Sequence, residues 1–291
     1  MQIIIPMSGE GKRFKTAGYT IPKPLIKVHD KPIIEHVINL FPGEKDFLFI
    51  CRNQHIEDYH IDIVLKSLKP AARVLGIEGN KLGPVYAVKQ AFEWIKDEEP
   101  VVVSYCDYFM DWNWEDFKKT VGNNFCDGCV PVYTNFHPNL LPENNFYASV
   151  DVDESGWMKE IKEKYSFAED KTKAFHSPGV YYFKSGAILK KYFQAVLNKN
   201  LSLNGEYYAS APYNLLVKDG LKVFVYNKIP HFCQWGTPED LEEYNYWFNF
   251  LKKMNQNEII NKAKFRFVNF CNEDISRIIE YWKNFFQKYK F

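Results

Sequence analysis

The chain has 291 residues, of which 46% are hydrophobic and 25% charged. This composition excludes natural disorder and suffices for one large domain or two modest ones. Lysine and arginine number 37 against 36 aspartates and glutamates, a net charge of +1, which excludes a global basic field for nucleic acid or an anionic membrane.

The sequence also indicates a compartment. Its start has no basic segment leading into a long apolar run, and no apolar stretch is long enough to span a membrane. Six cysteines are too few for a disulfide framework in a chain of this size. Cys126 and Cys129 form a C-x-x-C pair, but no second pair completes a zinc site. We therefore expect a cytoplasmic protein with no nucleic-acid or membrane partner.

Strand and helix patterns alternate along the first half of the chain. A β-branched run at residues 2–6 ends in a glycine-bearing loop, as a buried first strand does. Later apolar runs predict strands at 47–51, 73–77, 101–104 and 130–133, with helices between them at 33–40, 58–68 and 85–94. This order predicts an α/β fold with a largely parallel sheet, whose ligands sit at the carboxyl ends of the strands.

The pattern changes after residue 144. Residues 147–152 and 157–161 alternate in polarity about a turn, which predicts a hairpin, and strands at 180–183 and 221–226 flank a helix at 186–198. Thr237-Pro238-Glu239-Asp240 has the cap, the proline and the acid of a helix start, and the helix should reach about residue 254. Periodic residues 275–289 predict a helical appendage. We place a catalytic domain at 1–244 and a C-terminal helical extension, a candidate homo-oligomer interface, at 245–291.

The loop after the first strand is a candidate phosphate site, because glycines let backbone N–H groups approach a phosphate. Its sequence is Ser8-Gly9-Glu10-Gly11-Lys12-Arg13-Phe14. Phe14 replaces the third glycine of a dinucleotide fingerprint, and Arg13 replaces the Ser or Thr of a P-loop. A third interpretation has Arg13 and Lys23 binding a nucleoside triphosphate. A guanidinium fork suits a pyrophosphate, and an ammonium suits an α-phosphate that gains charge during reaction.

Several further motifs follow this loop in order over roughly residues 1 to 245. They are Ala17-Gly18-Tyr19, Pro22-Lys23-Pro24-Leu25, Lys31-Pro32-Ile33-Ile34-Glu35, Leu82-Gly83-Pro84, Ser104-Tyr105-Cys106-Asp107, Glu163-Lys164, Gly179-Val180-Tyr181, Gly205-Glu206-Tyr207 and Gly236-Thr237-Pro238-Glu239-Asp240-Leu241. Each motif is weak alone. The ordered set resembles the sugar-1-phosphate nucleotidylyltransferases of the NTP transferase superfamily, and most of all the branch encoded in bacterial capsule-biosynthesis clusters.

The resemblance implies a Rossmann-like, GT-A-like nucleotidyltransferase fold with a mixed, mostly parallel sheet. It implies Mg²⁺-dependent transfer of a nucleoside monophosphate from an NTP to a phosphorylated acceptor, with release of pyrophosphate. The product would be an activated nucleotide-sugar for capsule or other surface polysaccharide. Such a transfer needs charge neutralisation and in-line positioning more than a covalent nucleophile.

Position by position, the resemblance also implies roles for residues. The nucleotide would contact Met7, Ser8, Gly9, Glu10, Gly11, Lys12, Arg13, Lys23 and Gly83. The catalytic set would be Arg13, Lys23 and Asp107, and the metal ligands Asp107 and Gln234. The acceptor would contact Glu163, Lys164, Gly179 and Glu206.

Gln234 departs from the family pattern, because most members carry at this position the aspartate that completes the metal site. An amide oxygen can face Mg²⁺ but brings no charge. Asp111 is a further candidate ligand, and it is equally suited to a helix start. The change Gln234→Asp should then tighten Mg²⁺ binding, the outcome we favour, or repel the acceptor phosphate.

Three other functions stay open. A cytidylyltransferase acting on a non-sugar phosphate, such as phosphocholine or a phosphorylated amino acid, would share all the phosphate residues. A GT-A glycosyltransferase would use Asp107 in a metal motif to bind an existing nucleotide sugar. A nucleotide-sensing domain without catalysis is compatible with Gln234.

Overall fold

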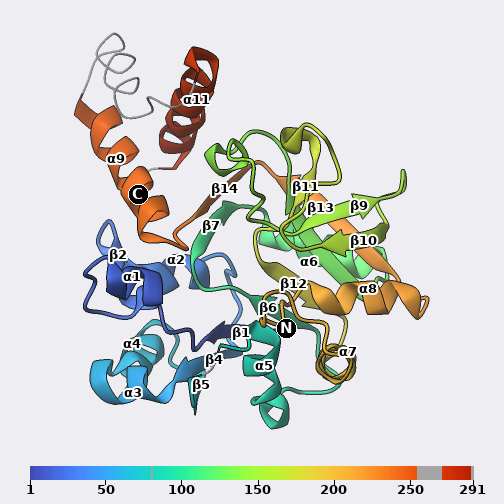
Figure 1. The fold of residues 1–291 in the computed structure, drawn as a ribbon. Helices are drawn as coiled ribbons and strands as arrows, with labels where there is room; N and C mark the ends of the chain where they lie inside the picture. The colour runs from blue at the N-terminus through green and yellow to red at the C-terminus, as the bar shows by residue number, and fades with distance from the viewer. Residues whose placement is uncertain (80, 254–270, 290–291) are drawn as a thin grey trace.

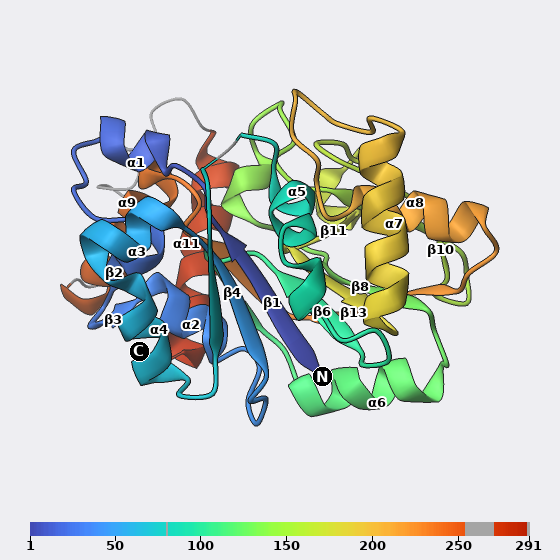
Figure 2. The same cartoon turned by 90° about the horizontal axis from the view of Figure 1, so that it is seen from below.

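The computed structural model describes residues 1–79, 81–253 and 271–289. A ten-stranded sheet forms the centre, in the order β10-β9-β11-β8-β12-β6-β1-β4-β5, and β13 also pairs with β8 outside this linear order. Two small sheets, β14-β7 and β2-β3, lie beside it. Figures 1 and 2 show the sheet with helices on both faces and with α9 and α11 together at one end.

The strands are β1 (Gln2–Met7), β2 (Lys27–Val28), β3 (Lys31–Pro32), β4 (Phe47–Arg52), β5 (Arg73–Ile77), β6 (Val101–Ser104), β7 (Tyr108–Asp111), β8 (Gly128–Tyr133), β9 (Ser149–Val152), β10 (Met158–Lys162), β11 (Phe175–His176), β12 (Val180–Phe183), β13 (Val223–Ile229) and β14 (His231–Gln234). The helices are α1 (Lys12–Thr16), α2 (Ile33–Ile38), α3 (Asn53–Tyr59), α4 (Ile61–Leu68), α5 (Pro84–Lys89), α6 (Trp114–Asn123), α7 (Gly186–Asn198), α8 (Ala211–Lys218), α9 (Pro238–Lys253) and α11 (Asn272–Lys288).

The N-terminal half of the sheet is parallel. Strands β6, β1, β4 and β5 run side by side in one direction, with Ile3 opposite Phe47 and Val102. The C-terminal half is antiparallel, except that β13 runs parallel to β8. The mixed α/β sheet is therefore confirmed. Its parallel half brings the ends of β1 and β6 together at one edge, where ligands of such sheets bind.

Two apolar layers cover the faces of the sheet because successive strand residues point to opposite sides. Ile3 and Ile5 of β1 face the layer that holds residues of α2, α4 and α6. Ile4 faces the layer that holds residues of α5, α7 and α8. All three isoleucines are fully buried, as a strand covered on both faces requires.

Most predicted elements are present with small shifts. The hairpin is confirmed as β9 and β10, and α7 begins after Ser185, whose hydroxyl oxygen accepts a hydrogen bond from the Ile188 N–H at 3.2 Å. The helix predicted at 58–68 is broken, because His60 adopts φ 50° between α3 and α4. The helix predicted at 85–94 consists of α5 and a 3₁₀ turn at Phe92–Trp94.

The C-terminal helices pack on the rest of the chain through aromatic side chains. Helix α9 begins at Pro238 and runs through Tyr244, so the boundary expected near that residue falls inside a helix. Trp282 of α11 lies edge-on to Tyr244, with ring centroids 5.8 Å apart. The Tyr281 hydroxyl donates to the carbonyl of Phe232 in β14. The division into two domains and the homo-oligomer interface stay predictions, and residues 254–270 of the expected extension lie outside the described ranges.

Among the described residues, we find no helix with both the length and the apolar character needed to cross a membrane.

Candidate active site

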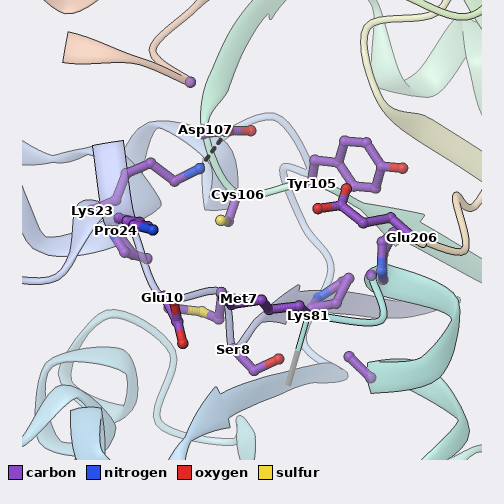
Figure 3. A pocket seen from close by; sticks show the side chains of 18 of the residues that line it. Met7, Ser8, Glu10, Lys23, Pro24, Lys81, Tyr105, Cys106, Asp107 and Glu206 are labelled. Atoms are coloured by element: carbon purple, nitrogen blue, oxygen red, sulfur yellow. Dashed lines mark hydrogen bonds and ion pairs between the residues drawn. The ribbon is translucent and has the colours of Figure 1, made fainter. Parts of the chain in front are cut away.

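A cleft of about 530 Å³ opens at the carboxyl ends of β1 and β6. Its lining includes every residue that the sequence predicted to contact a nucleotide: Met7, Ser8, Gly9, Glu10, Gly11, Lys12, Arg13, Lys23 and Gly83. Asp107 and Glu206 also line it. Residues from distant parts of the chain thus share one cleft, as Figure 3 shows.

The glycine loop forms the floor of this cleft and leads into α1. Gly11 has φ 62°, a left-handed conformation that suits glycine, and it is followed directly by the first residue of α1. Lys12 and Arg13 are exposed and line the cleft. Phe14 is buried and packs edge-on against Tyr19 at 5.1 Å, which fixes α1 on the protein. The loop therefore presents the cations Lys12 and Arg13 beside two glycines, Gly9 and Gly11.

Lys23 and Asp107 form an ion pair across the cleft, with 2.6 Å between the ammonium nitrogen and Oδ2. Both side chains are largely buried, 21% and 24% exposed. Burial acts to lower the pKa of Lys23, but the attraction of Asp107 outweighs it, and the pKa is raised. Lys23 is therefore a cation at neutral pH, held between Pro22 and Pro24 at the start of a 3₁₀ turn.

Asp107 follows β6 and is fixed from the side of β14. Its carbonyl accepts a hydrogen bond from the Trp235 N–H at 2.7 Å. Gly236 lies against its carboxylate so closely that a Cβ there would be 3.3 Å from Oδ2. A larger residue at 236 would crowd the carboxylate, so glycine at this position leaves room for the Asp107 side chain.

Tyr105 and Glu206 lie on the opposite side of the cleft (Figure 3), and Tyr208 also lines the cleft. The segment that carries Glu206 is held by backbone pairing, since the Tyr207 N–H donates to Leu82 at 2.8 Å. Gly83 makes this approach possible: its φ is 87°, and a Cβ there would lie 2.8 Å from the Tyr207 nitrogen. Gly83 thus allows the segment that carries Glu206 to pack directly on Leu82 and Gly83.

Three predicted acceptor residues, Gly179, Glu163 and Lys164, lie behind Tyr105 and Tyr208 and do not line the cleft. Gly179 has φ 101° and seats the Tyr105 ring, 2.7 Å from where its Cβ would be. Glu163 accepts a hydrogen bond from the Ser210 hydroxyl at 2.5 Å, and burial raises the pKa of Glu163 to about 7. The Lys164 ammonium is 5.8 Å from the centre of the Tyr208 ring. Their roles toward an acceptor stay predictions.

Gln234 is also outside the lining, and its amide is already engaged. Its Nε2 donates to both carboxylate oxygens of Asp240, at 3.1 Å each, and Asn139 donates to the same group at 3.1 Å. Burial raises the pKa of Asp240, while these hydrogen bonds oppose the rise. Asp240 also accepts from the Thr237 N–H at 2.9 Å, which completes the capping box of α9.

The side chains of the cleft fit a metal ion that takes most of its ligands from a bound substrate and water. No group of three His, Cys, Asp or Glu side chains that could hold a metal exists within 1–79, 81–253 and 271–289. Asp107 supplies one carboxylate at the cleft, and Mg²⁺ commonly takes few protein carboxylates plus substrate phosphates and water. Asp111 does not line the cleft and pairs with Lys288 of α11 at 2.5 Å.

The cysteines give no sign of covalent or metal chemistry. Cys106 lines the cleft, but burial raises the pKa of its thiol to about 12, so it is a thiol at neutral pH and not the reactive thiolate. Cys126 and Cys129 are buried free thiols within the core. Among the described residues the cleft therefore offers cations, the carboxylates of Glu10, Asp107 and Glu206, and tyrosine hydroxyls.

Sequence reasoning missed some residues of this site. Lys81, Tyr208 and Gly236 line the cleft but were given no role. Asp240 was assigned only to a helix cap, although a Cβ at Gly236 would lie 3.6 Å from its Oδ2 and 3.3 Å from that of Asp107. The capping motif was the only local signal for Asp240, and it pointed to structure.

Comparisons with known proteins agree with this geometry. The nucleotidyl transferase family model matches residues 2–215. The bifunctional protein GlmU of Staphylococcus epidermidis is 25% identical over 235 residues, which cover 77% of this chain and 47% of that protein. The glucose-1-phosphate cytidylyltransferase of Salmonella typhi is 23% identical over 186 residues, 56% of this chain and 69% of that protein. The chain spans about half the length of its GlmU relatives.

Solved structures share the fold at low sequence identity. A nucleoside-diphosphate-sugar pyrophosphorylase from Vibrio cholerae superimposes with a TM-score of 0.68 at 20% identity, over 87% of this chain and 100% of that one. The inositol-1-phosphate CTP transferase from T. maritima gives 0.62 at 15% identity, over 95% of each chain. Fold, cleft and family model agree, and the chain belongs to the nucleotidyl transferase family.

Proposed function

We propose that this protein transfers a nucleoside monophosphate from an NTP to a phosphorylated acceptor and releases pyrophosphate. The acceptor class we propose is a sugar 1-phosphate, and the product an activated nucleotide-sugar for capsule or another surface polysaccharide, made in the cytoplasm. One observation carries the proposal: the Lys23 and Asp107 pair, 2.6 Å apart, faces the glycine loop and Arg13 in one cleft. This is the set of charges that nucleotidyl transfer requires.

Residues of the cleft have different roles in the proposed reaction according to their charge. Backbone groups of the glycine loop, with Lys12 and Arg13, bind the β- and γ-phosphates, because a guanidinium makes paired hydrogen bonds to phosphate oxygens. Lys23 turns from Asp107 to the α-phosphate and stabilises the charge that builds there as the acceptor oxygen attacks. The acceptor phosphate is already an anion, so no general base is needed.

Mg²⁺ is the cofactor we propose, with Asp107 as its protein carboxylate and the Gln234 amide oxygen as a second candidate ligand. A bound Mg²⁺ would neutralise phosphate charge and orient the triphosphate. The Gln234 Nε2 donates to Asp240, which leaves the amide oxygen as the atom of Gln234 available to a cation. Because one carboxylate binds Mg²⁺ weakly, we expect the ion to enter together with the NTP.

The acceptor would lie between Tyr105, Glu206 and Tyr208, with Glu163 and Lys164 at the far end. Lys164 would meet the acceptor phosphate, and the carboxylates would accept hydrogen bonds from hydroxyl groups. A non-sugar acceptor is the second candidate, because the phosphate-binding residues do not depend on the rest of the acceptor.

Pyrophosphate release tests the proposal. Wild-type protein is incubated with Mg²⁺, each of the four NTPs and a panel of sugar 1-phosphates, inositol 1-phosphate and phosphocholine. We expect release with one preferred NTP that depends on a sugar 1-phosphate. The variant Lys23→Ala should release pyrophosphate about a hundredfold more slowly, whereas Lys27→Ala, which removes an exposed lysine of β2 outside the cleft, should retain activity. Release of free phosphate without acceptor, or no release with any pair, would exclude the function.

A further inference from the structure

Arg52 lies at the end of β4, between the two loops that form the floor and one side of the cleft. Strand β4 is flanked by β1 and β5, with Cys51 opposite Met7 and Arg52 opposite Ile77. The chain continues from β1 into the glycine loop, and after β5 it passes Gly79 and reaches Lys81 and Gly83. The glycine loop, Lys81 and Gly83 line the cleft. Strand β4 contributes no residue to that lining within the described ranges, so its arginine can act there only through its neighbours.

The Arg52 side chain reaches the glycine loop directly. Its Nε donates to the carbonyl of Ser8 at 3.3 Å, and its Nη2 is 3.7 Å from the Glu10 carboxylate. The side chain is only 14% exposed, and Nη2 is a buried atom with no hydrogen-bond partner among the described residues. A guanidinium so placed is a fixed support and not a solvated surface charge.

The same guanidinium fills the space beside the second loop. A Cβ at Gly79 would lie 2.1 Å from Cζ and 2.2 Å from Nη1 of Arg52, so the group stacks on the backbone of that glycine. The φ of Gly79 is not in the left-handed region, so glycine is needed here for space and not for conformation. Arg52 thus touches both loops.

We propose that Arg52 is a positioning residue that holds the glycine loop at a fixed separation from the backbone of Gly79. This inference rests on the proposed function, in which the glycine loop binds the phosphates of the NTP. A loop held in its bound conformation spends less free energy on ordering when the ligand binds. Loss of Arg52 should therefore weaken NTP binding, while groups that act on the α-phosphate stay in place.

The test measures NTP affinity directly by calorimetry, with each of the four NTPs and Mg²⁺ and with no acceptor present. Arg52→Ala should bind the preferred NTP about tenfold more weakly than wild type. Arg73→Ala is the matched control, because Arg73 also sits on the sheet and pairs with Asp46 at 2.8 Å but lies at the far end of β5. It should bind the NTP as wild type does.

Two further measurements separate positioning from a general loss of structure. Guanidinium ion, at concentrations that leave the wild type folded, should restore part of the NTP affinity of Arg52→Ala. Gly79→Ala, which leaves Arg52 present but displaces it, should weaken binding to a similar degree and should not respond to guanidinium. If Arg52→Ala does not fold, the NTP affinity of Gly79→Ala still tests the inference.

The outcomes distinguish this inference from the proposed function. Wild-type NTP affinity in both Arg52→Ala and Gly79→Ala overturns the inference even if pyrophosphate release is confirmed. Weakened affinity that guanidinium restores supports it even if no acceptor yields pyrophosphate, in which case the proposed transfer fails alone. A turnover lost at unchanged NTP affinity also contradicts it.

Discussion

Replacing Gln234 with aspartate should destabilise the protein, because the position faces a carboxylate already in place. The Gln234 amide donates to both oxygens of Asp240 at 3.1 Å. An aspartate removes these donors and sets a second carboxylate opposite the first. The sequence alone favoured a tolerated change with tighter Mg²⁺ binding, and the contact with Asp240 revises that expectation.

Two arguments bound the size of the effect. Two unit charges about 4 Å apart repel by about 4 kcal/mol at an effective dielectric constant of about 20. One carboxylate of the pair can instead bind a proton, which removes the repulsion. At pH 7 this costs about 4 kcal/mol for a carboxyl with an ordinary pKa near 4. Part of this repulsion is relieved by movement of the shorter side chain. We therefore expect a loss of about 2 to 4 kcal/mol in the free energy of unfolding.

Urea denaturation of Gln234→Asp and Gln234→Asn, with chelator present, isolates the charge because the two side chains have the same size. The shared site raises one carboxyl pKa in the folded state. The deficit of the aspartate variant should therefore be absent below about pH 4 and grow as pH rises through the raised pKa. Equal stability of the two variants at pH 7 would refute the reasoning.

Three other changes test separate parts of the site. Lys23→Ala should lower turnover about a hundredfold, which is roughly 3 kcal/mol in the activation barrier, because the lysine cation acts at the reacting phosphate. Its effect on NTP affinity should be much smaller. Equal losses in turnover and in NTP affinity would contradict this role of Lys23. Gly236→Ala places a Cβ 3.3 Å from Asp107 Oδ2 and should raise the Mg²⁺ concentration for half-maximal pyrophosphate release, whereas Gly122→Ala, with open space around its Cβ, should not. Burial raises the pKa of Glu163 to about 7, so wild type should lose about 3 kcal/mol of stability as pH rises from about 4.5 through 7, and Glu163→Gln should abolish that loss in urea titrations.

The sequence predicts the fold well where local patterns decide it. Apolar runs buried on both faces mark β1, β4 and β6, and the Thr237 cap marks the start of α9. The helix predicted at 58–68 was wrong as one unit because His60 leaves the helical conformation, and no proline or glycine there signals a break.

Site residues that belong to a local sequence motif could be predicted, whereas residues that reach the site only through tertiary contacts could not. The glycine loop and Lys23 stand out by residue type and spacing, and Asp107 by the motif that holds it. By contrast, Arg52 and Asp240 act through partners remote in the sequence, Ser8 and Asn139 respectively. Glu163 stands in a run of charges typical of a surface strand, yet tertiary packing partly buries it. Such contacts depend on how distant segments meet, which local patterns do not record.

The central claim is that this cleft transfers the α-phosphate with its nucleoside, and isotopic labelling tests it most directly. The preferred NTP, labelled at either the α- or the γ-phosphate, is supplied with Mg²⁺ and acceptor to wild type and to Asp107→Asn, which keeps the side-chain size but loses the charge. We expect the α-label to join the acceptor, the γ-label to leave in pyrophosphate, and Asp107→Asn to stay folded but inactive. A γ-label on the acceptor, or wild-type turnover in Asp107→Asn, would contradict it.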